Sequence, residues 1–70
     1  MSLYSVVVPV YNSEHTLYEL YERVSKVFDE TLHEEFEMIL VDDGSKDHSY
    51  EVMEELHDKD NRVKIIQQAR

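Results

Sequence analysis

Two adjacent carboxylates, Asp42 and Asp43, follow the apolar run Met38–Val41, and the chain's only glycine, Gly44, comes next. Four apolar residues in succession predict a strand that is buried on both faces, as in parallel sheets. Open α/β sheets bind their ligands at the carboxyl ends of such strands. The two acids could therefore bind a ligand, or they could only begin a turn and cap the next helix, and the local sequence favours neither interpretation.

A second polar segment follows another apolar strand. Tyr4–Val10 is rich in valine and predicts a buried strand, with Pro9 near its end because proline cannot donate to a ladder. If the two strands are neighbours, Tyr11 lies beside Asp42–Ser45. A flat base could lie against Tyr11 and Pro9, while Asp43 could accept a hydrogen bond from an imide N–H or a ribose hydroxyl. The free N–H groups at a helix start could bind a phosphate, so the two segments predict a nucleotide pocket.

Amphipathic segments separate the strands. Apolar residues three and four apart predict a first helix from Glu14 to Thr31, capped by Asn12 or Ser13. A second helix is predicted over His48–His57, with Asp47 as its cap.

A third short strand, Val63–Ile66, completes a β-α-β-α-β order. Right-handed crossovers then give a parallel sheet of order 3-2-1, which is half of a Rossmann-like α/β domain, with both helices on one face. The other face stays uncovered, and the first strand is an open edge. We therefore expect residues 1–70 to be one fragment of a larger domain, or to form a homo-oligomer through the exposed sheet face or edge.

Composition excludes several classes of partner. The 70 residues carry a net charge of −9, with 16 acidic and 7 basic side chains, and contain no cysteine. A nucleic-acid-binding surface needs a basic patch, and an anionic membrane would repel this segment. No apolar run approaches the ~20 residues that span a bilayer. A cytoplasmic location is expected, at the cytoplasmic face of a membrane in the full-length protein.

The two strand-end segments together resemble the start of glycosyltransferase family 2, whose members use nucleotide sugars and have the GT-A fold. The resemblance lies in Ser5–Asn12 (SVVVPVYN) and Ile39–Ser49 (ILVDDGSKDHS) and extends from Tyr4 to Ile66. Its closest branch loads sugars onto polyprenyl phosphates, as dolichyl-phosphate mannosyltransferases do.

The resemblance implies which residues bind the nucleotide of a UDP- or GDP-linked sugar. They are Pro9, Val10, Tyr11, Val41 and Asp43, with Asp42 and Glu14 as further candidates. In the polyprenyl branch a glutamate directly follows the asparagine. Here Ser13 holds that position and Glu14 comes one residue later.

The same resemblance implies that catalysis needs residues outside this chain. The family's Asp-x-Asp motif binds Mg²⁺ or Mn²⁺ and the sugar diphosphate, and it follows a fourth strand; the catalytic base comes later still. Both would lie beyond Arg70, so we expect no metal site, no catalytic residue and no sugar transfer from this chain alone.

Two other functions remain as alternatives. A signalling receiver domain also carries an acid pair after an apolar strand, but here the pair follows the second strand, and no later aspartate or lysine completes the site. A non-catalytic interaction module could instead use the uncovered sheet face as its partner surface.

Overall fold

The computed structural model describes residues 3–68. Its elements alternate between strands and helices along the chain. They are β1 (Leu3–Val10), α1 (Leu17–Lys26), the π-helical segment η1 (Val27–Leu32), β2 (Glu35–Asp42), α2 (Ser49–Lys59) and β3 (Val63–Gln67).

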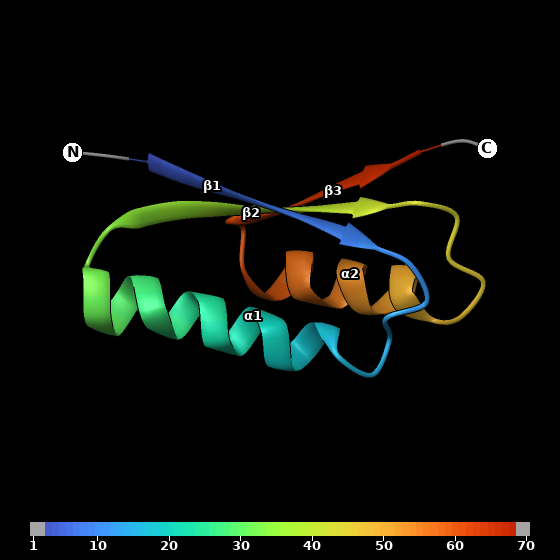
Figure 1. Ribbon diagram of the computed structural model, residues 1–70, viewed down its shortest axis with the longest axis horizontal. Coiled ribbons are helices and arrows are strands. Elements are labelled where there is room, and N and C mark those ends of the chain that lie inside the picture. Colours follow the sequence, from blue (N-terminus) through green and yellow to red (C-terminus); the bar gives the residue numbers. More distant parts are fainter. Residues whose placement is uncertain (1–2, 69–70) are drawn as a thin grey trace.

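The three strands form one parallel sheet in the order β1-β2-β3. Val10 pairs with Asp42 at the carboxyl end, and Met38 pairs with Val63 where β3 begins. Both helices lie on the same side of the sheet (Figure 1). The predicted α/β fold, its strand order 3-2-1 and the position of both helices are therefore confirmed.

The central strand β2 builds the core through alternate side chains. Phe36, Met38 and Leu40 are at most 2% exposed, because they point to the face that the helices cover. Each such side chain contributes about 1.5–3 kcal/mol relative to exposure. The core comprises Val10, Leu17, Phe36, Met38, Leu40, Met53, Leu56 and Val63.

The opposite face of the sheet is covered by no helix within residues 3–68 (Figure 1). Ile39 and Val41 of β2 are only half-buried, and Val7 of β1 is 61% exposed. Within residues 3–68 the second strand is therefore buried on one face only, against the apolar pattern of its sequence, and the expectation that the other face stays uncovered is confirmed. A buried parallel strand needs a layer on each side, and the described residues supply one layer.

The first helix begins later than its sequence pattern predicts. Its N-cap is Thr16, without a side-chain capping bond, so neither Asn12 nor Ser13 is the cap. The carbonyl of Ser13 accepts the N–H groups of Thr16 and Leu17, at 3.1 and 3.2 Å. Glu14 accordingly lies in a turn that precedes α1.

The end of this helix is π-helical and packs an aromatic group onto the sheet. His33, in the left-handed conformation with φ of 52°, ends it. The Phe28 ring stacks on that of Phe36, with 4.8 Å between centroids, and contacts Tyr4 at 5.6 Å. No helix in residues 3–68 has the length and apolar character needed to cross a membrane.

An ion-pair network joins α1, η1 and the loop before β3. Arg62 donates to Asp60 and, through two parallel bonds, to Asp29. Its guanidinium lies 4.4 Å from the ring centre of Phe36. The Tyr21 hydroxyl donates to Asp60 over 2.6 Å.

These contacts move the pKa of each acid in the network. Hydrogen bonds from Arg62, and then from Tyr21, hold the pKa of Asp60 far below its usual range despite partial desolvation. The Arg62 bonds also lower the pKa of Asp29. Burial, followed by the bond to Asp60, raises the pKa of Tyr21. At neutral pH the network thus contains ionised Asp29 and Asp60 and a neutral Tyr21 hydroxyl.

We predict that Asp60→Asn lowers the free energy of unfolding at pH 7 by about 1.5–3 kcal/mol, as expected when a bond between charged groups is lost. Because the pKa of Asp60 lies below its ordinary 3.8, its stabilisation is complete above that value and is lost as the pH falls below it. The difference between wild type and variant should therefore shrink in acid. Urea unfolding from pH 7 to pH 2 measures this, with the exposed Asp58→Asn as control. Equal stability of Asp60→Asn and wild type at pH 7 would contradict the assignment.

Candidate functional site

The carboxyl ends of β1 and β2 bring the two sequence motifs together. Val10 and Asp42 are partners in the last rung of the ladder. Immediately beyond it, the Asp43 N–H donates to the carbonyl of Val10 over 3.0 Å. The loop 11–16 therefore leaves the sheet beside the turn 43–48, as the parallel order predicts.

Four of the predicted nucleotide-binding residues are exposed or half-buried at this edge. Pro9 and Val41 are partners in the register and share the uncovered face of the sheet, where Pro9 is exposed and Val41 is half-buried. Tyr11, one residue beyond β1, is 54% exposed. Asp43 is half-buried at the start of the turn. Apolar, aromatic and acidic residues thus gather where the two strands end, which is a combination that suits a base and its sugar.

Two other predicted residues face the helix-covered side. Val10 is fully buried in the core, and Asp42 is 2% exposed. The Asp42 carboxylate accepts the Ser45 N–H over 3.0 Å, so it holds the turn that Gly44, with φ of 78°, makes possible. Val10 offers its carbonyl, which accepts the Asp43 N–H. Both residues are buried on the helix-covered side and hold the backbone of the turn after β2.

The two loops are joined at Asn12. Its N–H donates to the Ser45 hydroxyl over 3.1 Å, and its side-chain oxygen accepts the Lys46 N–H over 2.9 Å. Asn12 has a φ of 49°, a conformation that asparagine tolerates better than most residues. The residue directly after Tyr11 is thus attached to the turn after β2.

A second junction is centred on Asp47. One carboxylate oxygen accepts the N–H and hydroxyl of Ser49, and the other accepts the Glu14 N–H over 3.2 Å. Partial desolvation acts to raise the pKa of Asp47, but these hydrogen bonds outweigh it and hold the pKa below its ordinary value. Asp47 is not the N-cap of α2, which is His48 without a side-chain bond. The predicted cap is therefore wrong, although Asp47 does satisfy an N–H of the first turn.

The remaining candidate, Glu14, contributes its backbone to this junction. Its side chain is 25% exposed and lies 4.0 Å from the His15 ring. The structure places Glu14 beside the site without giving its carboxylate a further partner among residues 3–68.

No group of three or more histidine, aspartate or glutamate side chains within residues 3–68 could hold a metal ion. The tripeptide Asp58-Lys59-Asp60 has the spacing of an Asp-x-Asp motif, but it lies where α2 ends and the loop to β3 begins, at the other end of the sheet. Asp60 is engaged there by Arg62 and Tyr21. Asp42 is likewise committed to its turn. Residues 3–68 therefore do not provide the set of carboxylate ligands that a divalent metal ion would need.

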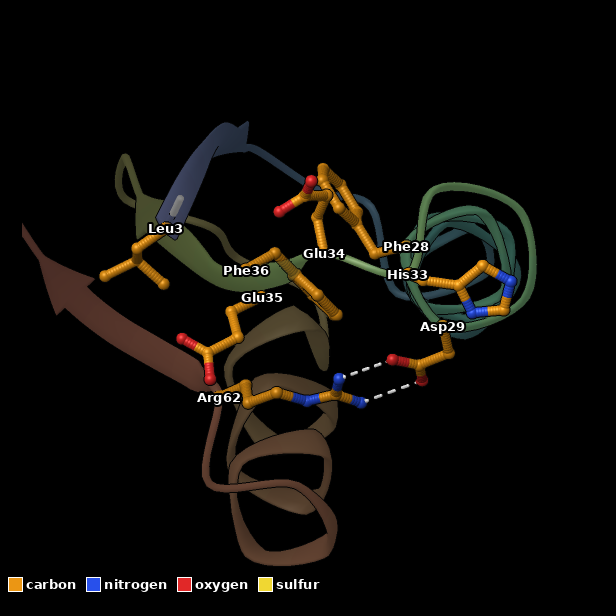
Figure 2. Close-up of a pocket in the computed structure, with 8 residues that line it drawn as sticks. All are labelled: Leu3, Phe28, Asp29, His33, Glu34, Glu35, Phe36 and Arg62. Carbon is orange, nitrogen blue, oxygen red and sulfur yellow. Dashed lines mark hydrogen bonds and ion pairs between the residues drawn. The ribbon is translucent and has the colours of Figure 1, made fainter. Parts of the chain in front are cut away.

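A cavity of about 570 Å³ lies at that opposite end of the sheet. Phe28 and Phe36 line one side of it, and Arg62 reaches across to Asp29 (Figure 2). His33 is also in its lining, but its ring is turned outward (Figure 2). This cavity contains none of the residues predicted to bind a nucleotide.

The parallel half-sheet and the joined loops at its carboxyl edge define a Rossmann-like α/β domain with a candidate ligand site at the strand ends. A family model described as glycosyl transferase family 2 matches residues 5–70. The chain belongs to this family, which confirms the resemblance seen in its sequence.

Individual relatives agree with this assignment. The chain is 49% identical over 67 residues to the uncharacterized glycosyltransferase YkcC of Bacillus subtilis, covering 96% of this chain and 20% of that protein. It is 50% identical over 63 residues to an undecaprenyl-phosphate 4-deoxy-4-formamido-L-arabinose transferase of Proteus mirabilis, covering 89% and 19%. It is 42% identical over 66 residues to glycosyltransferase GlyG of Streptococcus pneumoniae, covering 94% and 21%. The chain spans about one fifth of the length of these relatives.

Sequence reasoning missed the residues that join the two loops. Asn12, Ser45, Asp47 and Ser49 act through bonds between segments more than 30 residues apart. A density of short polar residues after each strand is the signal that could have indicated them, because asparagine, aspartate and serine bind backbone groups in turns.

We predict that Asp42→Ala destabilises the chain by about 1–3 kcal/mol, since it leaves the Ser45 N–H without its acceptor and creates a small void. Asp43→Ala, at a half-buried surface position, should cost less. Thermal unfolding of both variants followed by circular dichroism checks this order. A larger loss in Asp43→Ala than in Asp42→Ala would show that the supporting role is assigned to the wrong acid.

Proposed function

We propose that this chain is the nucleotide-binding portion of a glycosyltransferase that transfers a sugar from a UDP- or GDP-linked donor. The observation that carries the proposal is the adjacency of Tyr11 to the turn that begins at Asp43, fixed by the bond from the Asp43 N–H to Val10. Family membership supports the transfer of a sugar. The nucleotide site is our inference from the strand-end geometry.

Each residue of the proposed site has a separate task. Pro9 and Val41 offer an apolar surface, and Tyr11 offers an aromatic face on which a base can stack. Asp43 accepts a hydrogen bond from the base or the ribose. Val10 and Asp42 hold this arrangement from the buried side.

We assign no step of sugar transfer to this chain alone. Mg²⁺ or Mn²⁺ is expected in the whole enzyme, where it would polarise the donor diphosphate, but the described residues offer no set of ligands for it. The metal and the catalytic base are therefore proposed to be bound or supplied by other parts of the protein.

We further propose a polyprenyl phosphate as the acceptor of the whole protein. Several relatives are named as undecaprenyl-phosphate 4-deoxy-4-formamido-L-arabinose transferases, from Proteus and Pseudomonas. An acceptor with such a chain resides in a membrane, so the site of action proposed for the whole protein is the cytoplasmic face of that membrane.

We predict that UDP or GDP binds weakly to the chain, because base and ribose contacts act without a metal-held diphosphate, and that Asp43→Ala reduces this affinity at least about tenfold. Isothermal titration with UDP, GDP and the corresponding nucleosides measures it. Asp58→Ala, which removes a carboxylate at the other end of the sheet, is the matched control. Equal affinity of Asp43→Ala and wild type would refute the role given to Asp43.

We also propose that the isolated chain associates with a second copy through the uncovered sheet face or the edge strand β1. Val7 is 61% exposed, Ile66 is 49% exposed, and β1 is an unpaired edge. A net charge of −9 opposes association until salt screens it.

We therefore predict that sedimentation equilibrium detects dimers or larger species, and that their fraction rises with protein and salt concentration. Val7→Lys should shift the equilibrium towards monomer, because it places a charge in the uncovered face. Val27→Lys is the control, since Val27 is 45% exposed on η1, away from that face. A cooperatively folding wild-type monomer at high concentration and high salt would contradict this prediction.

A further inference from the structure

We infer that Asp47, acting with Ser49, is a positioning residue that fixes the loop carrying Tyr11 relative to the turn carrying Asp43. Its effect on ligand affinity rests on the nucleotide-binding function proposed above. Asp47 itself lies at neither of the two contact positions, so its role would be to set their separation.

The carboxylate of Asp47 joins two segments that are distant in sequence. One oxygen accepts from the Ser49 N–H at 2.9 Å and from its hydroxyl at 2.5 Å. The other accepts the Glu14 N–H at 3.2 Å. Three donors thus converge on one carboxylate, and one of them belongs to the loop after β1.

Ser49 extends the junction to the neighbouring residue of that loop. Its hydroxyl donates to Asp47 and accepts the Ser13 N–H over 2.7 Å. Ser49 is fully buried, so no water can replace the hydroxyl without a rearrangement. The consecutive N–H groups of Ser13 and Glu14 are therefore both held by the Asp47–Ser49 pair.

Tyr11 lies between this junction and the sheet. Its carbonyl accepts the Ser13 hydroxyl over 3.0 Å, and Asn12, which follows it, is bound to Ser45 and Lys46. Val10, which precedes it, is fixed in the β-ladder. The backbone on both sides of Tyr11 is thus bound to β2 or to the segment that follows it. Asn12 makes the nearer connection, and Asp47 makes the more distant one through Glu14.

A carboxylate is the group that this geometry requires. Asparagine has nearly the same shape, but it presents one oxygen and one NH₂ group. In Asp47→Asn the NH₂ group would face either the Glu14 N–H or the donors of Ser49. One side of the junction would then be lost, while the hydrophobic core would be unchanged.

The experiment compares Asp47→Asn with wild type in the intact chain, using ¹⁵N NMR and amide hydrogen exchange. Asp58→Asn is the matched control, because it makes the same chemical change on an exposed part of α2. We expect protection of the Glu14 amide or of the Ser13 amide, whichever lies on the lost side of the junction, to fall about tenfold or more in Asp47→Asn, which corresponds to the loss of one charge-assisted bond. The amides of β2 should keep their protection. The amide chemical shifts of Tyr11 and Asp43 should change.

Ser49→Ala provides a second variant if Asp47→Asn does not fold. It removes the acceptor of the Ser13 N–H while leaving the Asp47 carboxylate in place, so the Ser13 amide should lose protection more than the Glu14 amide. Unchanged exchange at both amides in a folded variant would overturn the inference.

Titration with UDP and GDP adds the functional part. Wild type that binds neither nucleotide would refute the proposed function, and amide exchange would still decide the positioning role. If wild type binds, Asp47→Asn should weaken affinity about tenfold while Asp58→Asn leaves it unchanged, as expected for a lost positioning bond. Loosened amides with unchanged affinity would overturn the link between Asp47 and the ligand.

Discussion

The alternation of side chains along β2 is the constraint on which the rest of the structure depends. It sends Phe36, Met38 and Leu40 into the core and leaves Ile39 and Val41 on the face that no described helix covers. The same alternation places Asp42 on the buried side in the last rung of the ladder. Asp43 is then the first residue beyond the ladder, so two adjacent and chemically identical side chains acquire different surroundings.

The strand order and the position of the helices were predictable because they follow from local patterns and a handedness rule. The start of α1 was not predictable, because it depends on distant partners. The N–H groups of Ser13 and Glu14, which a local reading assigns to the first turn of a helix, are bound by residues 36 and 33 positions later. Backbone donors that find partners across the sheet edge do not need to begin a helix.

For the candidate site, the sequence predicted that the segments after β1 and β2 are adjacent, but not which of their residues are buried. The closeness of Tyr11 and Asp43 follows from parallel neighbours whose carboxyl ends meet. Which candidate residues are buried and which are accessible depends on the register, which pairs Val10 with Asp42 and Pro9 with Val41. A shift of one residue would reverse which members of each strand face the core. An apolar run such as Val6–Val10 does not define that choice, since either alternate set could be buried.

Surroundings, more than sequence spacing, decide what each carboxylate does in this chain. Asp58-Lys59-Asp60 has the spacing of a metal-binding motif, yet Asp60 meets the guanidinium of Arg62 and the hydroxyl of Tyr21, so its charge stabilises the amino end of β3. Asp47 accepts N–H and O–H groups from the loop after β1 and from Ser49 at the start of α2, so it joins these two segments. Since backbone donors in a surface loop need partners, short acids and serines at the strand ends satisfy them without adding bulk above the site. Tyr11 remains exposed at this edge, where we propose that a planar base stacks on its ring.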